Sequence, residues 1–375
     1  MNFGFSEEQD LLRLEVRKFL DGQCPIKEVR RIAATPDGYS SEQWKHLAEL
    51  GWLGLVIPER YGGSDLGWEE LIVLLEETGR TLFPAPLIST TLAASAILIS
   101  GSEAQKERWL PGIADGSCIG TLAMVEPSDV WGPAGITLRG EPDGDGFVLR
   151  GEKSYVADGA QANLVVVGFR SGEADEELSL ALVETDATGV SSAEIPTLDR
   201  SKRLATLKLD AVHVAPDAIL GQPGSASTAI AELLDRGAIA ITAEMIGACE
   251  GAHALTVQYA KDRVQFGSPI GRFQGVKHPL AEGHVDIESM KSLLYYAAWA
   301  LDASPEEVPM AASKAKGFAT EAFTRIGVTG IQLHGAVGYT EEYDIQLYLK
   351  RSKWARPMYG DEDYHYDRVA TFGGI

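Results

Sequence analysis

The stretch from Arg263 to Gln274, RVQFGSPIGRFQ, combines an arginine and a glutamine with aromatic and glycine residues. The guanidinium of Arg263 offers a planar fork of donors that suits the paired oxygens of a pyrophosphate, and Gln274 can donate to and accept from an adenine edge. In the alternative interpretation, Arg263 is a solvated charge at a helix end, and Phe266, Pro269 and Ile270 mark a loop that returns to the core.

Motifs for several other chemistries are absent. The sequence has no GxSxG nucleophile elbow, no Walker loop, no HExxH and no strand–GxGxxG–helix fingerprint for a nicotinamide cofactor. The histidines are dispersed, and His278 and His284 are six residues apart, which does not place both on one helical face. We therefore expect no metal site.

The elements that position the Arg263 stretch follow from the hydrophobic pattern. Apolar residues recur at helical spacing from Ser6 to about Gly116, with Ser6 and Ser41 as expected N-terminal caps. Short alternating and β-branched runs follow up to Leu220, among them residues 205–209 and 212–214, and residues 143–146 (DGDG) are typical of a hairpin turn. The helical period then returns in three long elements, expected at residues 229–264, 274–301 and 309–333.

This order predicts an α+β multidomain chain with three domains. They are an N-terminal helical domain (residues 1–117), a central β domain (118–222) and a C-terminal helical bundle (223–375) that carries the oligomer contact.

Composition limits the partners. The chain has 375 residues, of which 45% are hydrophobic and 23% charged, as in an ordinary globular protein. A net charge of −21 argues against nucleic acid or an anionic membrane surface as the main partner, whereas an anionic small ligand would need local cations such as Arg263, Arg272 and Lys277.

The compartment is inferred from the cysteines and the N-terminus. Cys24, Cys118 and Cys249 lie far apart among apolar residues, which is typical of buried thiols in a reducing compartment. The N-terminal stretch, residues 1–20, is amphipathic and acidic and matches neither a secretory nor a mitochondrial signal, and no apolar run is long enough to span a bilayer. We expect a cytoplasmic protein.

Four segments in fixed order carry a resemblance to a known family. They are AMVEP (residues 123–127), GEKSYVADGA (151–160), RVQFGSPIGRFQ and the segment from Gln332 to Trp354. With the helical, β, helical layout, they make the chain similar to the acyl-CoA dehydrogenases over nearly its full length. The resemblance implies an N-terminal helical domain, a central β domain and a C-terminal four-helix bundle in a dimer or tetramer.

The resemblance also implies a reaction. In this family FAD is the cofactor, a carboxylate removes the α-proton of an acyl-CoA thioester, and a hydride leaves the β-carbon for the flavin, as in the β-oxidation of lipids. Electrons then pass to an acceptor such as an electron-transfer flavoprotein. The chain is expected to bind acyl-CoA as part of a homo- or heterotetramer.

The cofactor-binding residues are assigned by the same resemblance. Met124 and Val125 occupy the place that borders the flavin on the β domain, and Tyr155, Val156 and Ala157 occupy a strand along the flavin ring. A second group occupies positions that reach across the dimer contact to the neighbour's flavin, namely Arg263, Phe266, Gln274, Gln332, Leu333, His334, Gly335 and Ala336. The segment after Val125 departs from the family pattern, which usually has a threonine or serine before Glu-Pro and a Gly-Ser-Asp soon after.

The catalytic base is not identified by the sequence. The family's commoner base lies in a turn after the last motif, where counting from Lys353 places Tyr359, a poor base because a phenol has a pKa of about 10. The family's alternative position, on the long helix before Arg263, holds Gly237. Nearby carboxylates remain weak candidates, and each has an ordinary structural alternative: Asp235, Glu244, Asp361 and Glu362.

Three functions are therefore open. The chain is the base-deficient subunit of a heteromeric acyl-CoA dehydrogenase, whose base lies in a homologous subunit, as in family members that act on bulky acyl-CoAs such as steroid side chains. Alternatively, it is self-sufficient and uses Asp361 or Glu362. In the third interpretation it is a flavin monooxygenase or a non-catalytic structural partner on the same fold.

Overall fold

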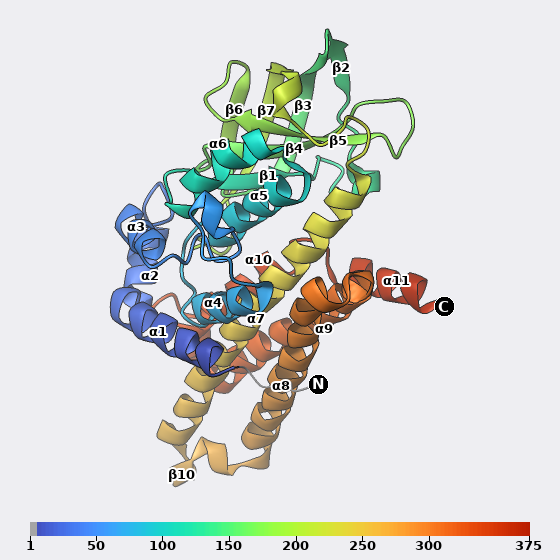
Figure 1. Cartoon of the computed structure of the whole chain (residues 1–375). Coiled ribbons are helices and arrows are strands. Elements are labelled where there is room, and N and C mark those ends of the chain that lie inside the picture. The colour runs from blue at the N-terminus through green and yellow to red at the C-terminus, as the bar shows by residue number, and fades with distance from the viewer. Residues whose placement is uncertain (1–5) are drawn as a thin grey trace. The chain divides into compact units, whose positions relative to one another are not determined.

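A computed structural model describes residues 6–375, and these fold into two compact units (Figure 1). One unit holds the described N-terminal residues up to Arg31 together with Trp68–Phe83 and Ala238–Ile375, and the other holds Ile32–Gly67 and Pro84–Gly237. The predicted order of helices, strands and helices is confirmed. The boundaries at residues 117 and 222 stay a prediction, and residues 1–5 of the N-terminal stretch lie outside the described part.

The first unit is built from helices. Its elements are α1 (Glu7–Gln23), α4 (Trp68–Arg80), the hairpin of β9 (Val264–Gln265) and β10 (Ser268–Pro269), η4 (Ile270–Arg272), α8 (Gln274–Ala303), η5 (Pro305–Glu307), α9 (Val308–His334), η6 (Gly335–Tyr339), α10 (Ile345–Ala355) and α11 (Glu362–Gly373). Two helices, α2 (Ile26–Ala33) and α7 (Ser227–Asp262), contribute residues to both units. The three long predicted helices are α7, α8 and α9, each within three residues of the expected bounds.

Small residues let these helices pack closely. Helix α9 is rich in alanine, a strong helix former, and its glycines face neighbouring side chains: Gly317 faces Tyr366 of α11, and Gly327 faces Leu349 of α10. Helix α7 crosses α4 at Gly247, where an added Cβ would lie 1.7 Å from the carbonyl oxygen of Glu76. Because that neighbour is backbone, only glycine allows this approach of α7 to α4.

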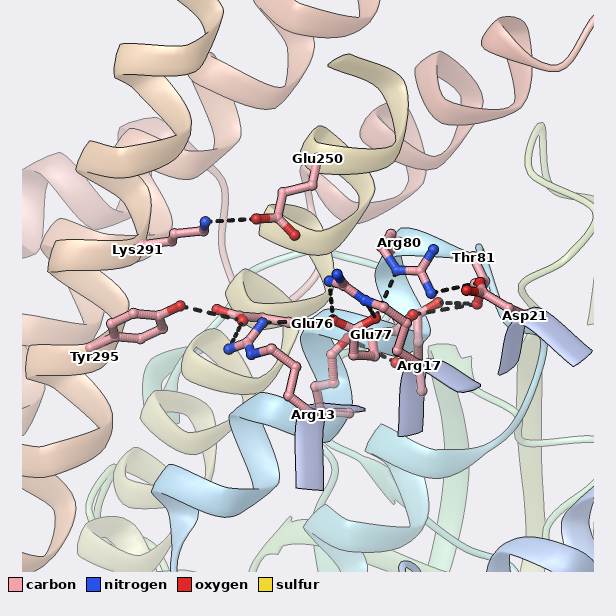
Figure 2. A network of polar contacts seen from close by, with 12 residues as sticks. Arg13, Arg17, Asp21, Glu76, Glu77, Arg80, Thr81, Glu250, Lys291 and Tyr295 are labelled. Atoms are coloured by element: carbon pink, nitrogen blue, oxygen red, sulfur yellow. Dashed lines mark hydrogen bonds and ion pairs between the residues drawn. The ribbon is translucent and has the colours of Figure 1, made fainter. Parts of the chain in front are cut away.

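A buried polar network joins α1, α4, α7 and α8 (Figure 2). Glu76 and Glu77 of α4 have fully buried side chains; Arg13 contacts Glu76 at 2.6 Å, and Arg17 contacts Glu77 at 2.7 Å. The phenol of Tyr295 on α8 donates to Glu76 at 3.4 Å. Burial raises the pKa of Glu76 to about 7, although Arg13 opposes the shift. The network fixes α1 onto the bundle by pairing two fully buried carboxylates with the partly exposed guanidiniums of Arg13 and Arg17.

The second unit contains the strands. Its elements are α3 (Ser41–Glu49), η1 (Glu59–Tyr61), α5 (Leu87–Ser100), α6 (Glu103–Ala114), β1 (Gly120–Ala123), η2 (Pro133–Gly135), β2 (Gly140–Asp143), β3 (Gly146–Ala157), β4 (Leu164–Arg170), β5 (Leu178–Glu184), β6 (Val190–Ile195), β7 (Leu204–Val214), η3 (Pro216–Ala218) and β8 (Ile219–Leu220). One sheet has the strand order β1-β4-β5-β8, and the other has the order β2-β3-β7-β6.

The sheets follow from the strand patterns. Every residue of β4 is buried, as expected of a central strand covered on both faces, and β4 pairs parallel to β1 and antiparallel to β5. The turn Gly144–Asp145 joins β2 to β3, as predicted. In β3 the register against β7 shifts between Lys153 and Val156, and this bulge leaves Tyr155 exposed with φ at 54°.

Two local predictions need correction. The cap of α3 is Ser40, whose side chain accepts from the Gln43 N–H, and Ser41 is the first helical residue. The two short runs expected at residues 205–209 and 212–214 form one strand, β7. Ser6 caps α1 as predicted, and the three cysteines are buried and form no disulfide among the described residues. Between residues 6 and 375, no helix is long and apolar enough to cross a membrane, and no cluster of metal-ligating side chains is found.

Candidate functional site

One end of the helical unit gathers the predicted dinucleotide-binding residues. Arg263 follows the last residue of α7, Gln274 begins α8, and Gln332 lies in the last turn of α9. The phenol of Tyr259, one turn before Arg263, donates to the carbonyl of His334 at 3.3 Å, so the ends of α7 and α9 are in contact. The structure therefore brings together segments that are about seventy residues apart in sequence.

The hairpin at this end presents apolar side chains to solvent. Phe266 is 95% exposed at its tip, with φ at 54°, and its ring meets Phe273 edge-on at 6.0 Å. Val337 and Tyr339, in the 3₁₀ turn after α9, are also exposed. Arg263, Gln274 and Gln332 are exposed as well, and the described residues offer their side chains no hydrogen-bond partner. Exposed aromatics beside free donors suit a ligand or a second subunit.

His334 is the buried member of this group. Its Nδ1 donates to the Gly330 carbonyl at 2.7 Å, which leaves Nε2 as an unprotonated acceptor with no partner among the described residues. The rings of Tyr259 and Tyr343 lie 4.3 and 4.9 Å from it, and burial lowers its pKa. Gly335 ends α9 with φ at 65°. Leu333 is half-buried, and Ala336 is exposed.

In the β unit, the Met124–Val125 segment is held against β3. The Lys153 ammonium, fully buried, donates to the Met124 carbonyl at 3.2 Å and to Glu126 at 2.7 Å, and the Ser154 N–H donates to the Val125 carbonyl at 2.8 Å. Burial lowers the pKa of Lys153 to about 8, although Glu126 opposes the shift.

Glu126 is satisfied on every side. It accepts from the Lys153 ammonium, from the Thr137 hydroxyl and N–H, and from the Leu138 N–H. Burial alone would raise the pKa of Glu126, but Lys153 and these hydrogen bonds lower it. The pair therefore fixes the segment and leaves neither charge free for chemistry.

The β-unit residues assigned to the flavin offer few side-chain donors. Val125 and Val156 are buried and apolar, and Ala157 uses its carbonyl to accept from the Thr121 hydroxyl at 2.6 Å. Met124 is also buried, so Tyr155, 39% exposed, supplies the one side-chain hydroxyl among these five residues. The β unit can therefore contribute apolar contacts and one phenol to a flavin site.

The turn expected to carry the base is tightly built. Tyr359 is 7% exposed and has φ at 58°, and Gly360 follows with φ at 96°. An added Cβ on Gly360 would lie 2.3 Å from the ring of Tyr364, so this position needs glycine. The carbonyl of Tyr359 accepts from Nε2 of His365 at 3.0 Å. Position 359 is therefore held in place, but it carries a phenol.

The two carboxylates beside this turn have structural roles. Asp361 caps α11, and its carboxylate accepts from the Tyr364 N–H at 3.0 Å. Glu362 pairs with the guanidinium of Arg356, whose Nε donates to Oε2 of Glu362 at 2.9 Å. Both arrangements direct the carboxylate oxygens to groups within the turn and its helix.

The candidates on α7 are also buried. Glu244 is 2% exposed and pairs with Arg351 of α10, whose guanidinium also donates to the Leu82 carbonyl at 3.4 Å. Asp235 is 2% exposed, and Gly237 belongs to the same helix. The pairing with Arg351 accounts for Glu244 without any catalytic role, because a buried carboxylate needs a partner.

Several residues that shape the site were not anticipated from the sequence. They are Lys153, Lys316, Arg351 and His365, all buried. The sequence carries no signal that these four residues share. Lys316 lies mainly among small apolar residues in AASKAKGFA, whereas His365 lies in the polar stretch GDEDYHYDR.

Two family profiles match most of the chain. Residues 6–117 match "Acyl-CoA dehydrogenase, N-terminal domain", and residues 227–373 match "Acyl-CoA dehydrogenase, C-terminal domain". The chain belongs to the acyl-CoA dehydrogenase family. It is thus an oxidoreductase that acts on CH–CH bonds, and the cofactor of the family is FAD.

Individual acyl-CoA dehydrogenases extend the match along the chain. Acyl-CoA dehydrogenase IpdE2 of Mycobacterium tuberculosis is 34% identical over 349 residues, covering 92% of this chain and 91% of that protein. The solved structure of a variant of the "Tcur3481-Tcur3483 steroid ACAD" is 32% identical with a TM-score of 0.89, covering 98% of both chains. A glutaryl-CoA dehydrogenase with glutaryl-CoA is 27% identical with a TM-score of 0.92, covering 100% of this chain and 98% of the other.

The two halves of this acyl-CoA dehydrogenase fit FAD unequally. The helical end has the donors of Arg263, Gln274 and Gln332 that a dinucleotide needs, and it adds one unpartnered acceptor, Nε2 of His334. The β half offers the Tyr155 phenol and apolar contacts. When bound, FAD supplies the hydride acceptor for the reaction.

Proposed function

We propose that this chain is the base-deficient subunit of a heteromeric acyl-CoA dehydrogenase. It lends Arg263, Gln274 and Gln332 to a flavin held mainly by a homologous subunit, and that subunit supplies the carboxylate base. The observation that carries the proposal is the turn at residues 357–360, where the position expected for the base carries the buried phenol of Tyr359.

The state of the nearby carboxylates supports this proposal. Asp361 caps a helix, Glu362 pairs with Arg356, and Glu244 pairs with Arg351. A base must reach the α-proton to within hydrogen-bond distance in a plausible substrate pose. For each of these groups, leaving its present partner would cost the stability that the partner provides.

The uneven fit to FAD supports the heteromer. A chain with free donors at its helical end and few side-chain donors in its β half is suited to completing a neighbour's site. The similarity to a steroid ACAD named for two components points to the same assembly and to a bulky acyl-CoA as substrate. An electron-transfer flavoprotein is the proposed electron acceptor.

The first test is to purify the chain alone and then with a base-bearing homologue. We expect the chain alone to be colourless or unstable, and the co-expressed complex to be yellow and to be reduced by acyl-CoA. A yellow homo-oligomer that acyl-CoA reduces would instead establish the self-sufficient enzyme. Substrate-dependent oxygen consumption with a hydroxylated product would indicate a monooxygenase, and a stable complex that never binds flavin would indicate a structural partner.

The second test separates the two dehydrogenase interpretations in the active assembly. Asp361→Asn keeps the helix cap, because asparagine caps as well as aspartate, and Glu362→Gln keeps one hydrogen bond to Arg356. We expect both variants to retain nearly full turnover, as should the control Asp363→Asn, an exposed residue in the first turn of α11. Loss of several orders of magnitude in turnover with flavin retained, for either variant alone, would assign the base to this chain.

The third test addresses the residues that this chain is proposed to contribute to the flavin site of its neighbour. Arg263→Leu should weaken flavin binding by the complex roughly 10- to 100-fold, the value of a charge-assisted hydrogen bond to a phosphate. The control Lys261→Leu removes an exposed charge two residues earlier and should leave flavin content unchanged. Equal flavin retention in both variants would show that Arg263 does not contact the cofactor.

A further inference from the structure

Lys316 is a lysine with no exposed surface, and it faces the turn that carries Tyr359. Its ammonium donates to the carbonyl of Arg356 at 2.9 Å and to the carbonyl of Gly360 at 2.8 Å. The third acceptor is the Thr320 hydroxyl at 2.9 Å, which itself donates to the Lys316 carbonyl. Three N–H donors thus meet three acceptors, and two of these are the carbonyls on either side of the turn.

The turn needs such support because its backbone is strained. Tyr359 and Gly360 are consecutive residues in the left-handed region, with φ at 58° and 96°. For a non-glycine residue this conformation costs about 1 to 2 kcal/mol, and such outliers persist where the surrounding structure holds them. Within the turn, the hydrogen bond from the Gly360 N–H to the Pro357 carbonyl, at 3.2 Å, is long. The strain is therefore balanced by contacts from outside the turn.

Two side chains from different helices supply those contacts. Lys316 of α9 holds the carbonyls of Arg356 and Gly360, and His365 of α11 donates from Nε2 to the carbonyl between them, that of Tyr359. Burial, together with the nearby charges of Lys316 and Arg368, lowers the pKa of His365 to about 3, so the ring is neutral and donates one N–H. Three carbonyls within five residues are thus fixed from outside.

We propose that Lys316 is the positioning residue of this turn and that it fixes where the side chain at position 359 lies. The inference deepens the proposed function, because it rests on the assignment of this turn as the place of the family's usual base. The support is present in this chain although the turn carries a phenol at the expected base position. Lys316 does not contact substrate or cofactor in this role; it acts through the backbone of residues 356–360.

Amide hydrogen exchange of the full chain at pH 6.5 tests the proposal. Burial lowers the pKa of Lys316 to about 7, so at this pH its ammonium form is retained. Lys316→Met keeps the length of the side chain and removes its donors. We expect exchange in peptides covering residues 356–361 to rise about tenfold or more, the value of a charge-assisted hydrogen bond, with strand peptides of β4 and β5 unchanged.

Two further variants separate positioning from general stability. Lys314→Met, on the same helix at an exposed site, should leave the turn unchanged. Lys316→Gln restores two N–H donors and should recover part of the protection. A rise of the same size in every peptide, or no recovery with glutamine, would reduce Lys316 to an ordinary structural residue and overturn the proposal. Should Lys316→Met not fold, Thr320→Val removes one acceptor of the ammonium, and a local rise of about threefold is expected.

The reactivity of a thiol placed at position 359 measures how firmly the side chain at that position is held. Cys24, Cys118 and Cys249 are buried, so Tyr359→Cys adds a thiol against a low background of reaction with a disulfide reagent. We expect slow labelling in the Tyr359→Cys chain and labelling at least about tenfold faster once Lys316→Met is added. Equal rates would refute the positioning role. Neither measurement depends on flavin or turnover, so its failure is distinguishable from failure of the base-deficient assignment.

Discussion

Replacing Glu244 tests whether this carboxylate is a structural partner or a catalytic base. The side chains of Glu244 and Arg351 are 2% and 1% exposed, and they form an ion pair between α7 and α10. Removing one member of such a buried pair leaves an uncompensated charge, which costs about 3 to 5 kcal/mol. We therefore expect Glu244→Met and Arg351→Met each to lower the free energy of unfolding by that amount.

The double variant isolates the pair. With both charges gone, Glu244→Met/Arg351→Met should lose less than about 2 kcal/mol, because apolar replacement of a buried pair is often neutral. The coupling energy from urea unfolding is then at least about 4 kcal/mol. The exposed pair of Glu28 and Arg31, with side chains 25% and 60% exposed, is the control, and its coupling should stay below about 0.5 kcal/mol.

Turnover of the double variant decides the catalytic question. If Glu244 is structural, the double variant in the flavin-loaded assembly should turn over acyl-CoA at the wild-type rate per folded protein. A stable double variant that binds flavin and has lost several orders of magnitude in turnover would identify Glu244 as the base. A coupling energy near zero would separately refute the assignment of a strong buried pair.

Two further predictions concern packing and pH. Gly247→Ala places a Cβ 1.7 Å from the Glu76 carbonyl oxygen and should lower the free energy of unfolding by about 2 kcal/mol or more. The control Gly22→Ala has nothing within 4 Å of its added Cβ and should raise the free energy of unfolding by about 0.5 kcal/mol. Equal effects of the two variants in thermal unfolding would contradict the close crossing of α4 and α7. The pKa of His365 is lowered to about 3 in the folded chain, so between about pH 6.5 and pH 3 the unfolded chain binds one more proton than the folded chain. The stability that depends on His365 is therefore complete above about pH 6.5. As the pH decreases from 6.5 to 3, the free energy of unfolding falls by up to about 1.4 kcal/mol per pH unit. His365→Gln should flatten that fall, and parallel stability curves for the two proteins would show that His365 does not titrate in this window.

The layout of this acyl-CoA dehydrogenase is largely readable from its sequence because it depends on local periodicity. Helical spacing predicted α7, α8 and α9 to within three residues, and the DGDG turn predicted the β2–β3 hairpin. The same local rules did not foresee that Ser40 rather than Ser41 caps α3, since either serine has a suitable side chain and the choice depends on where the chain enters the helix.

The candidate site was predicted only in part. Motif order pointed to the segments that contain Arg263, Gln274 and Gln332, and the structure places these residues at one end of the helical unit. The bulge that exposes Tyr155 in β3 arises from the register against β7 and has no signal in the strand's own residues. The assignment of these residues to FAD stays a prediction.

The sequence by itself determined the family and the order of elements, because both depend on which residues occur and in what order. That Tyr359 stands at the base position stays a prediction. The tertiary structure decided which charged groups already have partners. Glu244 forms an ion pair with Arg351, which is 107 residues away in sequence, and Lys316 donates to the carbonyl of Gly360, which is 44 residues away. Whether a carboxylate is free to act as a base depends on burial and on partners distant in sequence, which local patterns do not encode.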